Sequence, residues 1–204
     1  EVIYGLEHSD AKLLFADQKR MQGLESIKDV KKIVTSYTPD PLFKSFSDFI
    51  NEQSISFPEI EIGRNDPATI YYTSGSTGKP KGVLSSQKAV IATLFSWACF
   101  SSIMKEVDNQ KDPSSPPLLD EASAILLCVP LFHVTGSHAG MFMSILVGRK
   151  IVMMKKWDAG IALQLIEQEK ISDITGVPTQ TWELLNHPER LNYDLSSLKT
   201  LGAG

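Results

Sequence analysis

The sequence predicts an α/β protein in which mostly parallel sheets are flanked by layers of helices. Strand-like and helix-like segments alternate along its 204 residues, and this alternation is typical of parallel strands joined by helical crossovers. The segment Ala122–Pro130 reads "ASAILLCVP", an apolar run without alternation, so both of its faces are expected to be buried. The polar stretch Ser54–Pro67 is expected to separate a first α/β subdomain, 1–66, from a second, 67–204.

Hydrophobic periodicity places the individual elements in chain order, with apolar residues three or four apart in helices and β-branched or continuous apolar runs in strands. The expected helices are Glu1–Ser9, Lys19–Ile27, Phe43–Asn51, Gln87–Val107, Phe132–Val147, Ala159–Lys170 and Thr179–Asn186. The expected strands are Ala11–Asp17, Lys31–Tyr37, Ala68–Ser74, Gly82–Ser86, Ala122–Pro130, Arg149–Lys155 and Ser172–Val177. Gly23 weakens the second helix, and three prolines indicate a loop over Asp108–Glu121. In the long helix, the residues expected to face inward are Val90, Leu94, Trp97 and Ala98.

Composition excludes several classes of protein. A net charge of -4, with no block of like charge, gives no electrostatic reason to expect a nucleic-acid partner. The longest apolar run, Ala89–Phe100, is too short to span a bilayer, and no signal peptide is visible. Cys99 and Cys128 lie within apolar runs and are expected to be buried free thiols, as in a reducing compartment. These features predict a cytoplasmic protein without a transmembrane segment.

The stretch "TSGSTGKPKG", Thr73–Gly82, holds the chemistry most suited to a ligand. Four hydroxyl residues, three glycines and two lysines can offer backbone amides, hydroxyl donors and positive charge to a polyphosphate. It is not a Walker loop, because Gly75 and Gly78 stand too close together and Pro80 occupies the position of the magnesium-binding hydroxyl. The dinucleotide fingerprint is absent as well. On composition alone, a flexible hairpin turn remains the alternative.

The longer stretch "YYTSGSTGKPKGV" resembles the signature loop of the adenylate-forming, AMP-binding superfamily, which includes acyl-CoA synthetases, luciferases and adenylation domains. Further stretches resemble that family in the same order: "PLFHVTG", "GRKIVMMKKWDA", "ITGVPTQTWELLNHP" and "DLSSLKTLGAG". At the front, "YGLEHSDAKLLFAD" is similar to the fatty-acyl and medium-chain acyl-CoA synthetases. The resemblance covers essentially the whole chain and implies part of the large N-terminal domain of such an enzyme.

The resemblance implies a two-step reaction that needs ATP, Mg²⁺ and coenzyme A. A carboxylate attacks the α-phosphate of ATP, and a thiol then displaces AMP from the acyl-adenylate. The residues implied to bind the nucleotide are Thr73, Ser74, Gly75, Ser76, Thr77, Gly78, Lys79 and Lys81 around the β- and γ-phosphates, with Gly202, Ala203 and Gly204 at the start of the adenine loop. His133 is implied as the catalytic residue, lying between the acid pocket and the nucleotide, although a core histidine is the alternative. No metal ligand is assigned.

Several other residues are expected to have packing roles or roles that the sequence leaves open. His138 is expected to be a packing residue, and a metal site of His133, His138 and Cys128 has no common ligand spacing. Phe95, Trp97 and Phe100 fit either helix core or an acyl pocket. Val177 is implied to lie near the acyl tunnel or the adenine. Two positions depart from the family pattern: Ser86-Gln87 replaces the common Thr-His or Ser-His pair, and the Asp108–Glu121 loop is longer than usual.

The chain opens on Glu1 and ends within the adenine-loop pattern, which predicts an internal fragment of a longer protein. The family's acidic Mg²⁺ residue, ribose-binding Asp and catalytic Lys would follow Gly204, so the chain alone is not expected to turn over. The preferred function is a fatty-acyl-CoA synthetase acting on small-molecule substrates, with a homodimer left open. Alternatives are an aryl-CoA ligase, an acyl-AMP ligase, an adenylation domain or a non-catalytic nucleotide-binding module; a P-loop NTPase is disfavoured by the loop spacing.

Overall fold

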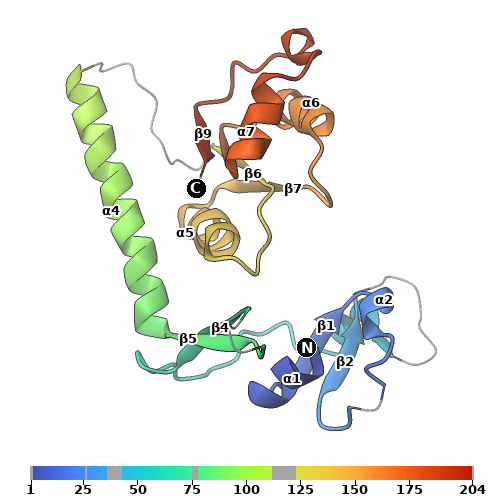
Figure 1. Ribbon diagram of the computed structural model, residues 1–204. Helices are drawn as coiled ribbons and strands as arrows, with labels where there is room; N and C mark the ends of the chain where they lie inside the picture. The colour runs from blue at the N-terminus through green and yellow to red at the C-terminus, as the bar shows by residue number, and fades with distance from the viewer. Residues whose placement is uncertain (1, 26, 36–42, 75–77, 112–122, 204) are drawn as a thin grey trace. The chain divides into compact units, whose positions relative to one another are not determined.

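The computed structural model describes residues 2–25, 27–35, 43–74, 78–111 and 123–203 (Figure 1). The chain divides into two compact units, Glu1–Ser86 and Gln87–Gly204, which are described one at a time. This division follows the second strand of a hairpin, whereas the sequence places a subdomain boundary between residues 66 and 67. The subdomain boundary remains a prediction about the family fold.

Unit 1 begins with a small parallel sheet in the order β1-β2-β3 and three short helices. Its elements are α1 (Val2–His8), β1 (Leu13–Ala16), α2 (Gln18–Met21), β2 (Lys31–Val34), β3 (Lys44–Ser45) and α3 (Phe46–Asn51). Met21, Leu24, Val30 and Ile33 are buried between them. These apolar side chains form the core of this part, which is the expected α/β arrangement.

Two of these helices differ from the sequence expectation, and each difference has a local cause. The helix expected over Lys19–Ile27 ends at Met21, because Gly23 adopts a positive φ of 84° that a helix cannot contain. The helix expected from Phe43 starts at Phe46, because the Ser45 hydroxyl accepts a hydrogen bond from the Asp48 amide and caps it. Residues Lys44–Ser45 pair with β2 instead.

Unit 1 ends in an antiparallel hairpin of β4 (Pro67–Thr73) and β5 (Lys81–Ser86). The strands pair from Pro67 opposite Ser86 to Thr73 opposite Lys81, with a register shift between Pro67 and Thr69. Aromatic and β-branched residues in "PATIYYT" favour extended backbone. The hairpin confirms the strand–loop–strand arrangement predicted around the glycine-rich loop.

Unit 2 is built on a four-stranded, all-parallel sheet in the order β7-β6-β8-β9. Its strands are β6 (Ala124–Leu127), β7 (Lys150–Met153), β8 (Asp173–Gly176) and β9 (Thr200–Ala203), and its helical elements are α4 (Gln87–Lys111), η1 (Thr135–Phe142), α5 (Met143–Val147), α6 (Ala159–Glu169), α7 (Pro178–Leu185) and η2 (Arg190–Asn192). The central strand β6 is buried along its whole length, as its continuous apolar run predicts. The mostly parallel α/β layering is therefore confirmed.

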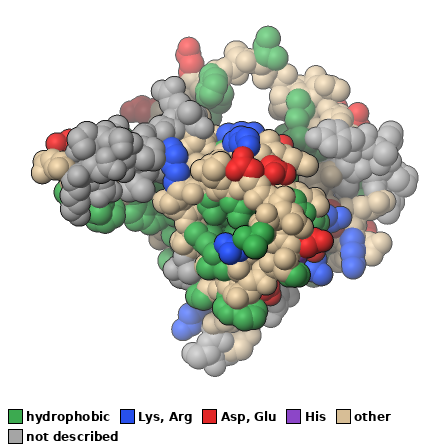
Figure 2. Space-filling model, turned by 90° about the horizontal axis from the view of Figure 1, so that it is seen from above, with side chains coloured by type: hydrophobic (Ala, Val, Ile, Leu, Met, Phe, Trp, Pro, Cys, Tyr) green, Lys and Arg blue, Asp and Glu red, His purple; other side chains and the backbone are tan. Residues whose placement is uncertain are grey.

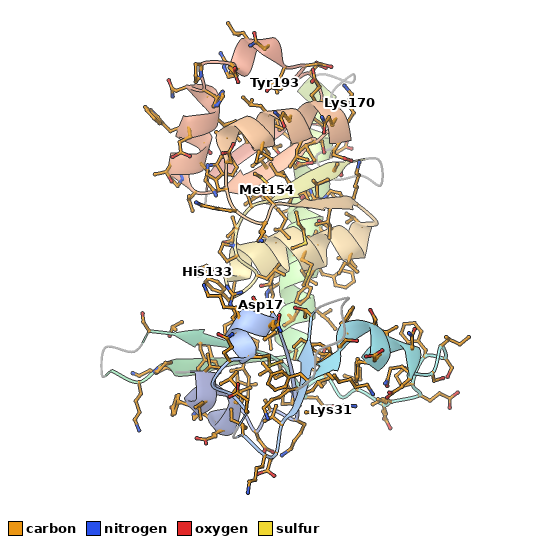
Figure 3. All side chains as sticks on the ribbon, turned by 90° about the vertical axis from the view of Figure 1, so that its right-hand side faces the viewer. Asp17, Lys31, His133, Met154, Lys170 and Tyr193 are labelled. Carbon is orange, nitrogen blue, oxygen red and sulfur yellow. The ribbon has the colours of Figure 1, made fainter. Side chains whose placement is uncertain are left out.

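Helices cover both faces of this sheet (Figure 1). On one face, Leu126 of β6 and Ile174 of β8 pack against Leu163 and Ile166 of α6 and Leu184 of α7. Met154 and Tyr193, labelled in Figure 3, complete this core as partly buried side chains. On the other face lies the π-helical segment η1, whose Gly140 sits directly over Leu127. Each face of the sheet therefore has its own layer.

The helix α4 runs to Lys111, beyond the expected end at Val107; residues 112–122 of the expected Asp108–Glu121 loop lie outside the described part of the chain. Val90 is buried as predicted, while Leu94, Trp97 and Ala98 are half-buried. The prediction that Cys99 is buried is wrong, because this thiol lies on the exposed face of α4, whereas Cys128 is partly buried.

Among the described residues, no helix combines the length and apolarity that a membrane span requires.

Candidate active site

The glycine-rich loop connects the two strands of the hairpin in unit 1. Thr73 ends β4 and lies opposite Lys81, which begins β5. Ser74, Gly78 and Lys79 follow between them and are exposed. Gly75, Ser76 and Thr77, also predicted to bind phosphates, lie outside the described residues. The hairpin therefore brings the described members of the predicted phosphate site to one end of a strand pair.

Gly78 and the two lysines have the conformation and charge that the prediction requires. Gly78 has a φ of 85°, a region that residues with a side chain rarely enter. Lys79 and Lys81 are both exposed, and within the described chain neither forms an ion pair. Their ammonium groups are thus available to an anion, which a point charge of this kind binds well.

An aromatic cluster lies beside this loop and was missed by sequence reasoning. The Tyr72 hydroxyl lies 2.8 Å from His8 Nδ1 and donates to the Gly5 carbonyl at 3.3 Å. The Tyr4 and His8 rings are stacked with their centroids 5.3 Å apart, and Lys79 Nζ lies 5.7 Å from the centre of the Tyr4 ring. Helix α1 therefore contacts both the strand before the loop and a lysine within it. No local pattern signals contacts between residues more than 60 positions apart.

His133 lies in unit 2, in the connection between β6 and η1 (Figure 3). Its side chain is exposed, and its ring lies 4.7 Å from the ring of Phe132. Its backbone is fixed, because the His133 amide donates to the Pro130 carbonyl while the His133 carbonyl accepts from the amide and hydroxyl of Ser137. The connection thus holds an accessible imidazole on an ordered backbone, and the core-histidine alternative for His133 is wrong.

His138 is the buried histidine of this region. It is 5% exposed, its Nδ1 lies 3.1 Å from the Ser137 hydroxyl, and its ring packs against Phe142. Burial lowers the pKa of His138, because desolvation disfavours the charged imidazolium. The packing role predicted for this residue is confirmed.

The adenine-loop residues lie at the carboxyl edge of the sheet. Gly202 is in register with Thr175, and Ala203 with Gly176; Gly204 lies outside the described residues. Because parallel strands all end at the same edge, the loop with His133 after β6 emerges at this edge too, where open α/β sheets bind ligands. Val177, implied to lie near the acyl tunnel or the adenine, follows β8 there and is exposed.

Gln180 of α7 ties two of these strand ends together. Its Oε1 accepts from the Val177 amide at 3.0 Å, and its Nε2 donates to the Cys128 carbonyl at 3.4 Å. A β-carbon on Gly176 would lie 2.7 Å from Gln180 Oε1, so the glycine leaves room for this side chain. The sequence motif "TGVPTQ" thus encodes a junction between β6, β8 and α7.

Charged side chains do not gather into a patch of one sign on the face shown in Figure 2, where basic and acidic groups are interspersed. Within the described residues, no group of three or more His, Cys, Asp or Glu could hold a metal ion. Each unit therefore has its own candidate site: the phosphate-type loop in unit 1, and the carboxyl edge of the parallel sheet in unit 2.

Comparison with known proteins agrees with this geometry. The AMP-binding enzyme family matches residues 1–204. Among curated relatives, 4-coumarate–CoA ligase 3 of Arabidopsis thaliana is 28% identical over 208 residues, covering 100% of this chain and 35% of the relative. Feruloyl-CoA synthase of an Amycolatopsis species is 31% identical over 147 residues, covering 72% and 27%. The chain spans about a third of the length of the curated relatives that it matches.

Solved structures share the fold. Apo MatB from Rhodopseudomonas palustris superposes with a TM-score of 0.75 at 19% identity, covering 100% of this chain and 37% of that one. A fatty acyl CoA synthetase of Mycobacterium tuberculosis gives 0.70 at 21% identity, covering 97% and 35%. Because the family matches from the first residue to the last and the fold agrees, this chain belongs to the AMP-binding, adenylate-forming enzyme family.

Proposed function

We propose that the protein containing this chain activates a carboxylic acid with ATP and transfers the acyl group to coenzyme A. The observation that carries the proposal is the hairpin loop, which displays exposed Ser74, Lys79 and Lys81 around a glycine of positive φ within a chain that matches the family throughout. Hydroxyl donors, backbone amides and unpaired ammonium groups suit the oxygens of a triphosphate.

The reaction proceeds in two displacements. A carboxylate oxygen of the acid attacks the α-phosphorus of ATP, the bond to the β-phosphate oxygen breaks, and pyrophosphate leaves with the electron pair. The thiolate sulfur of coenzyme A then attacks the acyl carbon, and AMP leaves as the carbon–oxygen bond breaks. In the first step two anions must approach each other, so the lysines of the loop contribute by neutralising the phosphates.

His133 is the residue assigned to the acid. Its imidazole is exposed beside the carboxyl edge of the sheet, and its backbone is held by hydrogen bonds to Pro130 and Ser137. A histidine in this position can donate a hydrogen bond to a carboxylate oxygen and orient it for attack. Mg²⁺ would supply further charge neutralisation when bound to the nucleotide; no ligand for it is assigned among the described residues.

Two classes of acid, fatty and aromatic, are candidates for the substrate. The N-terminal similarity "YGLEHSDAKLLFAD" favours a fatty acid, whereas the curated relatives at 28% and 31% identity are named for 4-coumarate and ferulate, both aromatic acids. Both classes have an apolar body and one reacting carboxylate, so they share the chemistry above. The aromatic class is the first to test, because the named relatives activate such acids.

The test uses the full-length gene product with ATP, coenzyme A and a panel of aromatic and aliphatic acids, and measures AMP and thioester together. We expect at least one acid to give equal amounts of both. Lys81→Ala should raise the KM for ATP by about tenfold, the typical effect of losing one charged contact, whereas Lys12→Ala, which removes a lysine paired with Asp10, should not. Absence of AMP with every acid would refute the proposal.

A further inference from the structure

A cavity of about 300 Å³ lies within unit 2, on the face of the sheet that carries η1. Its walls come from α4, η1 and α5, and its floor comes from the sheet. The lining residues are Trp97, Phe100, Ser101, Ala139, Met143, Arg149, Asp173, Thr175 and Thr200. The walls are mostly apolar, whereas every residue that the sheet and its adjoining turn contribute to the floor is polar or charged.

The floor contains a buried arginine that is only partly satisfied. The Arg149 side chain is 4% exposed, and its Nε and Nη2 both donate to the Ser144 hydroxyl, at 3.1 and 3.0 Å. Its Nη1 lies 3.7 Å from Asp173 Oδ2, which is ion-pair distance but too long for a hydrogen bond. Nη1 therefore has no hydrogen-bond acceptor among the described residues.

Asp173, by contrast, accepts a hydrogen bond at each of its two carboxylate oxygens. Its Oδ1 accepts from the Thr200 hydroxyl and its Oδ2 from the Ser172 hydroxyl, both at 2.5 Å. Burial lowers the pKa of Arg149 while the Asp173 carboxylate acts in the opposite direction, and an arginine stays charged under such a shift. The floor thus combines a carboxylate whose two oxygens are both hydrogen-bonded with a cation whose Nη1 has no acceptor among the described residues.

A hydroxyl extends this polar floor toward the carboxyl edge of the sheet. Thr175 lies two residues after Asp173 in β8, so both side chains face the cavity. Its hydroxyl makes no hydrogen bond within the described part of the protein. Thr175 is in register with Gly202 of β9, a residue of the predicted adenine loop. The cavity therefore reaches the strand segment at which the proposed reaction takes place.

Arg149 and Thr175 both line the cavity, so a bound ligand would shield their donors from water, and a donor shielded without an acceptor is costly. A ligand that brings an oxygen atom to Nη1 of Arg149 and to the Thr175 hydroxyl would avoid this cost. Trp97, Phe100 and Met143 supply apolar contact for the rest of such a ligand. The volume lies at the lower end of the range for ligand sites, which suits an aromatic ring or a short chain better than a long alkyl tail.

We infer that this cavity receives the far end of the acid substrate, and that this end bears an oxygen acceptor held by Arg149 and Thr175. The inference rests on the proposed function and narrows its substrate class to acids with a distal hydroxyl, carbonyl or carboxylate. Arg149 and Thr175 are specificity-determining residues, since they lie at the sheet floor and not at the reacting carboxylate.

The test compares acids of matched size in the full-length gene product. One pair is 4-hydroxycinnamate and 4-methylcinnamate, and a second is 8-hydroxyoctanoate and nonanoate. The readout is the ratio of kcat/KM for the oxygenated acid to that for its methyl partner. We expect a ratio above about ten for at least one pair, because an unpaired buried donor penalises the methyl compound.

Two variants locate the source of this preference. Thr175→Val, which keeps the shape of the side chain, should lower the ratio by about threefold to tenfold. The double change Arg149→Met with Asp173→Leu removes both charges together and so avoids a buried carboxylate without its partner; it should bring the ratio to one or below. Lys150→Met changes a neighbouring lysine that is paired with exposed Glu169, and should leave the ratio unchanged.

The outcomes separate the two proposals. The inference is overturned if the enzyme is active but the ratio is near one for both pairs of acids. It is also overturned if neither Thr175→Val nor the double change alters the ratio. In both cases the proposed function still stands. Failure of every acid to yield AMP overturns the proposed function and the inference with it. Thermal unfolding of each variant shows whether it is folded, and Thr175→Val provides the decisive comparison if the double variant is not.

Discussion

The imidazole of His8 lies 2.8 Å from the phenolic oxygen of Tyr72, joining helix α1 to strand β4 across 64 positions of sequence. Tyr72 also donates to the Gly5 carbonyl, so a single hydroxyl contacts two points of α1. The strand that holds Tyr72 continues directly into the glycine-rich loop. Helix α1 therefore fixes the base of the candidate phosphate site.

Replacing Tyr72 by Phe removes this hydroxyl and retains the ring. We expect unit 1 to lose about 0.5–1.5 kcal/mol of unfolding free energy, the net value of a typical hydrogen bond, measured by urea unfolding. Tyr4→Phe is the matched control, since the Tyr4 hydroxyl makes no hydrogen bond within the described residues and its stacking on His8 is preserved. Equal stability of the two variants would show that the Tyr72 hydroxyl does not hold α1.

Gly136 is required by the close approach of η1 to the preceding turn. A β-carbon at this position would lie 2.4 Å from the Pro130 carbonyl oxygen and 2.7 Å from that of Val129. Because both are backbone atoms, Gly136→Ala must displace the connection that holds His133, and we expect a loss of about 1–3 kcal/mol.

Gly5→Ala serves as the counterpart, since a β-carbon there meets nothing within 4 Å and lies in a helix. It should stabilise α1 by up to about 1 kcal/mol. Thermal unfolding of the two variants should shift in opposite directions. A Gly136→Ala protein as stable as the parent would contradict the close packing seen here.

Gly78 differs from Gly136, because a side chain at Gly78 is disfavoured by the backbone conformation and not by neighbouring atoms. A β-carbon there meets no atom within 4 Å, but φ is 85°. Gly78→Ala should therefore cost about 1 kcal/mol through strain alone, and it should raise the KM for ATP if the loop binds phosphate in this conformation. Asn tolerates positive φ better than Ala, so Gly78→Asn should have the smaller effect in the same assay.

His138 should make unit 2 sensitive to acid. Its folded pKa is lowered by burial from the ordinary value of 6.5, so the unfolded chain binds the proton more readily. Its contribution to stability is complete above pH 6.5 and declines as the pH falls below that value, with a slope of at most about 1.4 kcal/mol per pH unit.

His138→Gln removes the titrating group at that position. Urea unfolding at pH 8 and pH 5.5 should show a smaller pH dependence in the variant than in the parent. His8, His133 and His187 are present in both proteins, so the difference between the two slopes reports His138. Identical slopes would mean that His138 is protonated equally well in both states.

The sequence predicts most of the elements because their signals are local. The apolar run of β6 and the glycine loop between β-branched segments need only neighbouring residues to be recognised. The sequence indicated only that Gly23 weakens the helix expected there. In the structure Gly23 has a positive φ and ends that helix early. The exposure of Cys99 could not be predicted, because a helix with apolar residues on several faces does not indicate which face packs against the rest of the protein.

The site was predicted unevenly for the same reason. The loop residues are contiguous, so their pattern was visible, whereas His8 and Tyr72 meet only in the folded chain. Asp173 and Thr175 alternate with Ile174 along a strand, a period-two signal that could have identified polar side chains facing one side of the sheet. Their partner Arg149 lies in the turn just before β7, and only the parallel pairing of the strands brings it near.

Strand β8 has Asp173 at its amino end and Gly176 at its carboxyl end. Four residues of extended chain separate these ends by roughly 10 Å, with Asp173 in the floor of the cavity and Gly176 beside Gln180. A substitution at the first position leaves the backbone junction at the last position untouched. Under the proposed function, duplicated copies of such a gene can therefore diverge in the acid that they bind while inheriting the same proposed reaction.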